Sequence, residues 1–194
     1  MCGISIISNN CMAGAMLHDL GMKYYTPTVS IQMMPEEYSK FCKNITKYMG
    51  FELLEYNKED LSDFHRDCLT RLYGKVPDDF PLAKCGDLLV CLRHYPTFED
   101  GNEKWERRRK RFNPGCVGYI FYAFGEEYKK EIDEFVALGL KNSVVLTENF
   151  DVDIPIEHYR INTDRPNGFL DYDENGNRYY ANTFDAAKWI AKLK

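Results

Sequence analysis

The fold class of this chain is decided by its first segment, Gly3-Ile-Ser-Ile-Ile-Ser-Asn-Asn-Cys-Met-Ala-Gly-Ala-Met-Leu-His-Asp-Leu-Gly21. The isoleucines near its start are β-branched, which favours a strand. The residues that follow, Ser8, Asn9 and Asn10, are typical of turns and of helix N-termini, where their side chains accept hydrogen bonds from backbone amides. Apolar residues then recur at helical spacing until Gly21, a typical helix stop. The segment therefore predicts a buried strand, a tight polar turn and a helix.

Cys11 lies at or just inside the N-terminus of this predicted helix. Unpaired amides and the helix dipole at such a position lower the pKa of a thiol and favour the nucleophilic thiolate. The same amides can hold an oxyanion or a phosphate. The alternative is that Cys11 is a small apolar residue in a packed turn, as many buried cysteines are.

Length and composition are those of one globular domain covering residues 1–194, because 194 residues are enough to bury a core. The net charge of -5 argues against general affinity for nucleic acid. Aromatic residues make up 14% of the chain, which fits a fold with much half-buried surface or a sugar-binding cleft.

The segments expected of a secreted or membrane protein are not seen in the sequence. It opens without the basic region and cleavage site of a signal peptide, and no apolar run approaches the roughly 20 residues that span a bilayer. The 7 cysteines are odd in number and form no Cys-x-x-Cys pair, so we expect reduced thiols in the cytoplasm and no metal or cofactor. These cysteines are Cys2, Cys11, Cys42, Cys68, Cys85, Cys91 and Cys116.

Strand and helix patterns alternate along the rest of the chain. The predicted strands are 29–34, 51–56, 87–93, 117–124, 143–147 and 158–161, and the predicted helices are 35–49, 102–112, 126–138 and 184–193. Such alternation predicts an α/β fold of three layers, with a mostly parallel sheet and helices on both faces. Residues 57–85 are polar and interrupted by Gly and Pro, which suggests an insertion, and Asn175-Gly176 predicts the turn of a small C-terminal hairpin. The acidic residues of that hairpin lack the spacing of a calcium loop.

His94 and Tyr95 follow the strand 87–93, whose nearly continuous apolar character is typical of a strand covered on both faces. Open α/β sheets place their sites at the carboxyl ends of central strands, so we expect the Cys11 turn and the His94 loop at the same sheet edge. His18 is a poor base for Cys11, because seven residues of helix separate the two by about 10 Å. We expect His65 to be a solvated surface residue.

The helix 102–112 carries Arg107, Arg108, Arg109 and Arg111. A basic run is usually a solvated helix face, but inward arginines can hold a phosphate or carboxylate bidentately. Trp105 and Phe112 should face the core and draw part of the run inward, where an unpaired charge is unfavourable. We therefore expect at least one of Arg107, Arg108 and Arg111 to point into the cleft beside His94.

Several blocks of this sequence together resemble a bacterial family catalogued as domain of unknown function 1919, whose members are often labelled exopolysaccharide or capsule biosynthesis proteins. The blocks are Ile7-Ser-Asn-Asn-Cys-Met-Ala-Gly14, Leu20-Gly-Met-Lys-Tyr-Tyr-Thr-Pro-Thr28, Tyr38-Ser-Lys-Phe-Cys-Lys-Asn44, Arg93-His-Tyr-Pro-Thr-Phe-Glu99 and Lys104-Trp-Glu-Arg-Arg108. The resemblance covers most of the chain in order, with Met12 where the family pattern has Trp. It implies a role in making exopolysaccharide or capsule.

A weaker resemblance links the same chain to papain-like cysteine peptidases. It rests on Ser8-x-x-Cys11, on Leu20-Gly21 before a Pro-containing extension, and on a His followed by an Arg-rich helix. This likeness implies that Cys11 is a nucleophile and His94 its base.

Three hypotheses of function remain open. In the first, Cys11 and His94 catalyse acyl transfer or hydrolysis on a glycan or glycan precursor. In the second, the protein is a glycosyltransferase-like or sugar-nucleotide-binding protein whose turn holds phosphate. In the third, it is a non-catalytic assembly partner. The candidate substrate-binding residues are Ser8, Asn9, Asn10, Tyr95, Arg107, Arg108 and Arg111; nucleic acid and stable membrane insertion are not expected, and the sequence makes no prediction of the oligomeric state.

Overall fold

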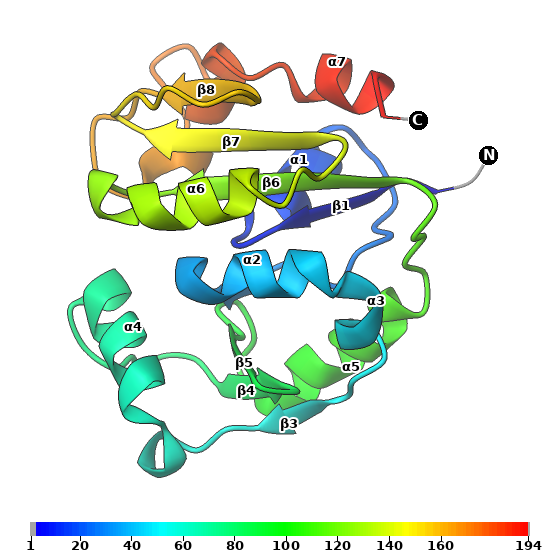
Figure 1. Cartoon of the computed structure of the whole chain (residues 1–194), viewed down its shortest axis with the longest axis vertical. Coiled ribbons are helices and arrows are strands. Elements are labelled where there is room, and N and C mark those ends of the chain that lie inside the picture. Colours follow the sequence, from blue (N-terminus) through cyan, green and yellow to red (C-terminus); the bar gives the residue numbers. More distant parts are fainter. Residues whose placement is uncertain (1–2, 194) are drawn as a thin grey trace.

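The computed structural model describes residues 3–193, which form two sheets separated by helices (Figure 1). The first sheet is parallel, in the order β1-β6-β7-β8, and the second is antiparallel, in the order β2-β5-β4-β3. The parallel strands are β1 (Ser5–Ser8), β6 (Val117–Ala123), β7 (Ser143–Glu148) and β8 (Glu157–Ile161). The antiparallel strands are β2 (Gln32–Met33), β3 (Leu53–Glu55), β4 (Leu82–Cys85) and β5 (Leu88–Cys91).

Helices alternate with these strands, so the predicted α/β class is confirmed. The α-helices are α1 (Met12–Asp19), α2 (Pro35–Lys43), α3 (Ile45–Tyr48), α4 (Asp63–Tyr73), α5 (Phe98–Arg109), α6 (Lys129–Val136) and α7 (Ala186–Ala191). Short 3-10 turns are η1 (Lys58–Asp60), η2 (Glu126–Tyr128), η3 (Gly168–Leu170) and η4 (Tyr179–Asn182). One core cluster joins α1 and α7 to one face of the parallel sheet, and a second joins α2 and α6 to the other face.

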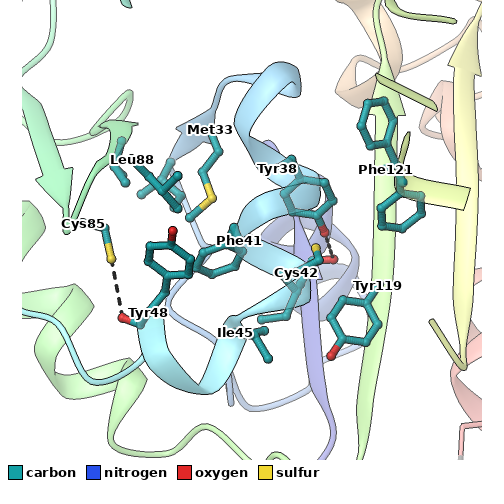
Figure 2. Packing of buried hydrophobic residues seen from close by; sticks show 14 of the residues in the cluster. Met33, Tyr38, Phe41, Cys42, Ile45, Tyr48, Cys85, Leu88, Tyr119 and Phe121 are labelled. Carbon is teal, nitrogen blue, oxygen red and sulfur yellow. Dashed lines mark hydrogen bonds between the residues drawn. The ribbon is translucent and has the colours of Figure 1, made fainter. Parts of the chain in front are cut away.

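Helix α2 lies between the two sheets and packs against both (Figure 1). Figure 2 shows Tyr38, Phe41 and Cys42 of this helix, with Leu88 of β5 on one side and Phe121 of β6 on the other. Each large apolar side chain buried in this way contributes about 1.5–3 kcal/mol of transfer free energy. The Tyr38 hydroxyl also donates a hydrogen bond to the Ile7 carbonyl, at 3.0 Å. This packing fixes β5 relative to β1, and so fixes the loops that follow these two strands.

The strand predicted at 87–93 forms, but the prediction that it belongs to the parallel sheet is wrong. β5 pairs antiparallel with β2 and with β4. Leu88 and Val90 face the cluster around α2, whereas Leu89 and Cys91 face the cluster around α4. An apolar run of this kind reports that both faces are covered, and it carries no information about the direction of the neighbouring strands.

Residues 57–85, predicted to be an insertion, contain the helix α4 and the strand β4. The Ser62 hydroxyl accepts a hydrogen bond from the His65 amide at 3.2 Å and caps the start of α4, and Gly74 ends the helix with a φ of 77°. β4 then pairs with β5 over its whole length. The helix was missed because its polar residues outnumber the apolar ones that pack on the antiparallel sheet.

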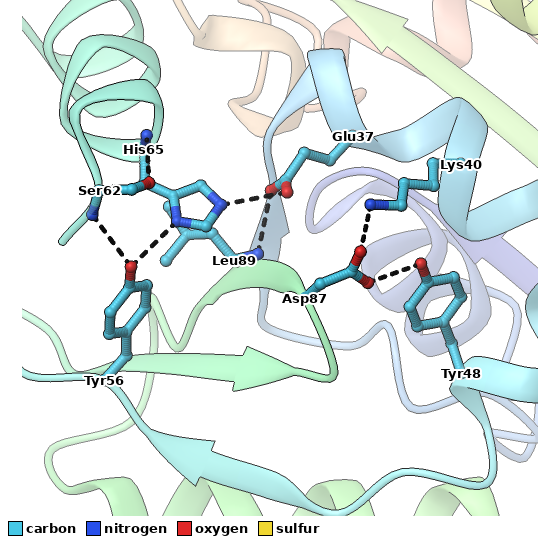
Figure 3. Close-up of polar contacts among 8 residues, drawn as sticks. All are labelled: Glu37, Lys40, Tyr48, Tyr56, Ser62, His65, Asp87 and Leu89. Atoms are coloured by element: carbon cyan, nitrogen blue, oxygen red, sulfur yellow. Dashed lines mark hydrogen bonds and ion pairs between the residues drawn. The ribbon is translucent and has the colours of Figure 1, made fainter. Parts of the chain in front are cut away.

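His65 was predicted to be solvated, and that prediction is wrong, because only 6% of the surface of His65 is exposed. Figure 3 shows the His65 ring between the Tyr56 hydroxyl, 3.2 Å from Nδ1, and Glu37 Oε1, 3.1 Å from Nε2. Tyr56 oxygen accepts the Ser62 amide, and the other Glu37 oxygen accepts the Leu89 amide. The Tyr56 hydroxyl is therefore assigned as the donor to Nδ1, and the Nε2–H group of His65 as the donor to Glu37 Oε1. With this assignment every group in the network has a partner. The network ties α4 to α2 and β5.

Three predicted boundaries change. α5 begins at Phe98, capped by Thr97, rather than at Asn102. The helix expected over 35–49 is divided at Asn44 into α2 and α3. The helix expected over 184–193 begins at Ala186 and is capped by Asp185, whose side chain accepts the Lys188 amide.

The C-terminal hairpin is reduced to a single antiparallel bridge between Tyr172 and Arg178. Gly176 adopts the positive φ of 79° that the predicted turn requires. Among residues 3–193, no helix has the length and apolar character needed to cross a membrane.

Candidate functional site

The turn between β1 and α1 is held together by its own side chains, and the predicted strand, turn and helix are confirmed. Ser8 Oγ accepts the Ala13 amide at 3.0 Å and donates to the Asn10 carbonyl at 2.6 Å. Asn10 Oδ1 accepts the Met12 amide at 3.0 Å. The Asn9 side chain exchanges two hydrogen bonds with the backbone of Tyr122, at 2.9 and 2.8 Å, and so extends the pairing of β1 with β6.

These bonds change what the turn can offer to a ligand. The amides of Met12 and Ala13, which were expected to hold an oxyanion or phosphate, are already engaged by Asn10 and Ser8. The polar atoms of Ser8 and Asn9 are likewise committed to the protein, and both residues are fully buried. Asn10 Nδ2 is the exception, because this buried donor has no hydrogen-bond partner among the described residues.

The side chains of Cys11 and His94 meet, with 3.2 Å between Sγ and Nε2. Cys11 is the N-cap residue of α1, and His94 stands in the turn after β5, where the Tyr95 amide donates to the Leu92 carbonyl at 3.1 Å. The two residues are 83 positions apart and lie beyond the ends of strands in different sheets. The expectation that they share one sheet edge is therefore wrong. The side chains still converge, because α2 packs against both sheets and fixes the position of one relative to the other.

The electrostatic setting favours the neutral forms of both groups. Burial raises the pKa of the Cys11 thiol to about 11, and the nearby Arg93 charge opposes this shift. Burial, and then the same Arg93 charge, lowers the pKa of His94. The lowered thiol pKa expected from the helix N-terminus is not found, because desolvation outweighs the helix dipole here. At neutral pH the pair is a thiol hydrogen-bonded to a neutral imidazole.

Two acceptors lie within reach of the Cys11 thiol, His94 Nε2 at 3.2 Å and the Ile31 carbonyl at 3.8 Å. In the tautomer that supports catalysis, Nε2 of His94 accepts the S–H hydrogen and the ring hydrogen is on Nδ1. The hydrogen bonds of residues 3–193 include none to Nδ1, so the pair is a dyad. The chemistry that such a dyad supports is general-base removal of the thiol proton as the sulfur attacks an electrophile.

A cavity of about 240 Å³ opens beside the dyad. Its lining comprises Cys11, Gly14, Ala15, His18, Tyr24, Val29, Ser30 and His94. Ser30 has a φ of 63°, which is uncommon for a residue with a side chain and is found most often at functional sites. His18 is exposed, as expected, and joins this lining from the far end of α1.

Arg108 is buried and is not among the residues that line the cavity. Its Nη1 donates to the Tyr95 hydroxyl at 2.6 Å and to the Val29 carbonyl at 3.2 Å, and its guanidinium lies 5.4 Å from the Tyr24 ring centroid. The Tyr95 hydroxyl in turn donates to the Val29 carbonyl at 3.0 Å. Arg108 and Tyr95 thus hold the segment that carries Ser30 in place, and their polar groups face the protein.

The other arginines of α5 and its end do not reach the dyad cavity. Arg107 is exposed and lies 3.8 Å from Glu103. Arg109 pairs with Glu106 through two hydrogen bonds of 2.6 Å. Arg111 keeps its Nε buried without a partner, outside the cavity lining. Within residues 3–193, no three His, Cys, Asp or Glu side chains are grouped so as to hold a metal ion.

Comparison with known proteins relates the chain to a family. Residues 2–191 match the family described as Domain of unknown function (DUF1919). The chain belongs to the DUF1919 family. An uncharacterized protein of Haemophilus influenzae is 26% identical over 192 residues, which cover 97% of this chain and 84% of that protein.

In this DUF1919 protein, sequence reasoning missed Arg93, the residue that precedes His94. Its charge acts on both members of the dyad, whereas the arginines of α5 are engaged elsewhere. The adjacency of an arginine to the candidate base was the one signal that pointed to it. Ser30 and Tyr24 were also missed, because they reach the cavity through a loop whose path depends on packing, and Gly14 of α1 was missed as a lining residue.

Proposed function

We propose that this protein is a cysteine-dependent enzyme of acyl transfer or hydrolysis, with Cys11 as nucleophile and His94 as general base. The observation that carries the proposal is the 3.2 Å contact between Cys11 Sγ and His94 Nε2 at the edge of a cavity. A buried structural cysteine needs no imidazole at hydrogen-bond distance, whereas a thiol with a raised pKa needs a base in order to react at neutral pH.

The reaction proceeds in two steps. Cys11 sulfur attacks the carbonyl carbon of an acyl donor while its proton passes to His94 Nε2, and the bond from that carbon to the leaving group then breaks. His94 returns the proton to the leaving group. In the second step, a hydroxyl acceptor or water gives a proton to His94 and attacks the thioester, which releases Cys11 as a thiol. Asn10 precedes Cys11 in the chain, and its buried Nδ2 has no hydrogen-bond partner among residues 3–193, so it is our candidate donor to the oxyanion.

A glycan or glycan precursor is the substrate class implied by the resemblance to exopolysaccharide and capsule proteins. The six cysteines within the described residues are all free thiols, which agrees with a reducing compartment such as the cytoplasm. The sugar-nucleotide alternative has less support, because the Met12 and Ala13 amides and the Arg108 guanidinium already bind the protein itself. The role of assembly partner has no specific observation in its favour.

Acyl-enzyme formation with p-nitrophenyl acetate tests the proposal. We expect one acetyl group on Cys11 by peptide mass spectrometry, its loss in Cys11→Ala, and a rate about 10²–10⁴-fold lower in His94→Gln. Cys116→Ala is the matched control, since among residues 3–193 Cys116 is the other partly exposed thiol. Acetylation that persists in Cys11→Ala, or that is independent of His94, would overturn the proposal.

A further inference from the structure

A second and larger cleft, of about 450 Å³, opens on the other side of the His94 turn. It lies between the end of α4 and the loop before β4, and its lining includes Tyr73, Lys75, Asp78, Asp79, Phe80 and Arg93. Arg93 is exposed and immediately precedes His94 in the chain. The Arg93 charge acts on both Cys11 and His94, so a group bound by Arg93 in this cleft is within electrostatic range of the dyad.

The Arg93 guanidinium is positioned by stacking rather than by a carboxylate. Its central carbon lies 5.3 Å from the Tyr73 ring centroid and 5.7 Å from the Phe80 ring centroid. The two rings pack edge to face, 5.6 Å apart, and form a fixed support. Within residues 3–193 no carboxylate forms an ion pair with Arg93, and its one polar side-chain neighbour is the Tyr73 hydroxyl, so its remaining donors are open to a ligand.

The acidic side chains of the cleft are not equivalent. Asp78 is already paired with Lys58, at 2.7 Å, and lies 3.9 Å from Lys75. Asp79 forms no ion pair within the part of the chain described, and it lines the same cleft as Arg93. An anionic group suits Arg93 and a neighbouring hydroxyl suits Asp79, so the chemistry of the cleft matches a ligand that carries both.

We propose that Arg93 binds an anionic group of the substrate, a phosphate or a carboxylate, and so places the reacting carbonyl beside Cys11. The guanidinium fork suits the oxygen geometry of either group. This inference rests on the proposed function, since it names the chemistry of the substrate for the same dyad. It also replaces the anion site expected on α5, whose arginines face elsewhere.

Charge selectivity of Cys11 alkylation tests the inference. Iodoacetate is anionic and iodoacetamide is neutral, and both react with the same thiolate, so the ratio of their rates is independent of the pKa of Cys11. We expect Arg93→Gln to lower the iodoacetate-to-iodoacetamide ratio about three- to tenfold, as expected for loss of one nearby charge in a partly solvated site. Arg93→Lys should keep most of the ratio, and Arg107→Gln, which removes an exposed arginine of α5, should leave it unchanged.

Inorganic phosphate and acetate, used as competitors, distinguish the two anion types. Protection of Cys11 from iodoacetate by either anion, lost in Arg93→Gln, supports the inference and identifies the preferred group. An unchanged ratio in Arg93→Gln, with Cys11 reactive, overturns the inference and leaves the proposed function intact. If Cys11 reacts with neither reagent, the proposed function fails, and calorimetric titration with phosphate then decides: binding lost in Arg93→Gln supports the anion site, and equal or absent binding refutes it.

Discussion

At Cys11 two physical influences act in opposite directions on the thiol. The helix N-terminus and the Arg93 charge favour the thiolate, while burial beneath the Ser30 loop favours the thiol. Burial prevails, and the pKa rises to about 11. The reactivity of Cys11 therefore depends on His94 as a base at the moment of attack, rather than on a stable ion pair.

This conclusion predicts how Cys11 responds to pH. Iodoacetamide reacts with thiolate that is already formed and does not need the general base, so a pKa of about 11 makes the rate of Cys11 alkylation rise about tenfold per pH unit between pH 7 and 10. Cys11 should still react before Cys42, Cys85 and Cys91, which are buried. Quantitative mass spectrometry of each cysteine peptide measures this. A plateau between pH 6 and 8 would instead reveal a thiolate–imidazolium pair.

At the scale of elements, Arg108 connects α5 to the loop between α1 and β2, which carries Val29 and Ser30. Arg108→Lys keeps the charge but removes the guanidinium, whose Nη1 donates to both the Tyr95 hydroxyl and the Val29 carbonyl and whose plane lies near the Tyr24 ring. We expect a loss of about 1.5–3 kcal/mol in the free energy of unfolding, the range for hydrogen bonds to charged groups. Arg107→Lys is the matched control on the same helix, and urea denaturation measures both. Equal stability of the two variants would show that Arg108 does not hold the loop.

The contact of α4 with the antiparallel sheet depends on the Tyr56 hydroxyl. Tyr56→Phe leaves the Ser62 amide without its acceptor and the His65 ring without its donor, in a buried site (Figure 3). We expect a destabilisation of about 1–3 kcal/mol. Tyr159→Phe removes an exposed hydroxyl that lies 3.4 Å from Glu157, and should change stability by less than about 0.5 kcal/mol. Similar urea midpoints for the two variants would contradict the role given to Tyr56.

At the scale of the whole molecule, buried thiols make the fold sensitive to alkali. Burial raises the pKa of Cys68 and of Cys85 to about 12, and that of Cys42 and Cys91 further above the usual 9.0. At a pH between the thiol pKa of the unfolded chain and that of the folded chain, the unfolded chain has lost protons that the folded chain keeps. The free energy of unfolding is therefore at its full value below about pH 8.5 and falls as pH rises above it. Urea unfolding at pH 7, 9 and 10.5 measures the decline. Replacement of Cys91 by Ala should reduce its slope, and an unchanged free energy at pH 10.5 would refute the prediction.

The sequence by itself determined the parts of the molecule that depend on near neighbours. The turn and helix from Ser8 to Asp19 were predictable because most of their hydrogen bonds join residues a few positions apart. The strand Ser5–Ser8 was predictable from its β-branched residues, although its hydrogen bonds join it to the distant strand β6. Gly21 ends α1 with a φ of 62°, and the amides of Gly21 and Met22 bond back to His18 and Leu17, as a glycine stop implies. The candidate pair of Cys11 and His94 was also named from the sequence, on the strength of a resemblance and of the loops in which they stand.

Only the tertiary structure decided which distant segments meet. The apolar run of β5 did not reveal an antiparallel sheet, because burial on both faces erases the alternation that would report its neighbours. The polar surroundings of His65 in the sequence did not reveal a buried network, because its partner Glu37 comes from another helix. The Arg108 side chain turned to the Val29 carbonyl and the Tyr95 hydroxyl, and Arg93, next to His94 in the chain, was left to line a cleft. Each of these outcomes depends on α2 packing between two sheets, a contact that no local pattern encodes.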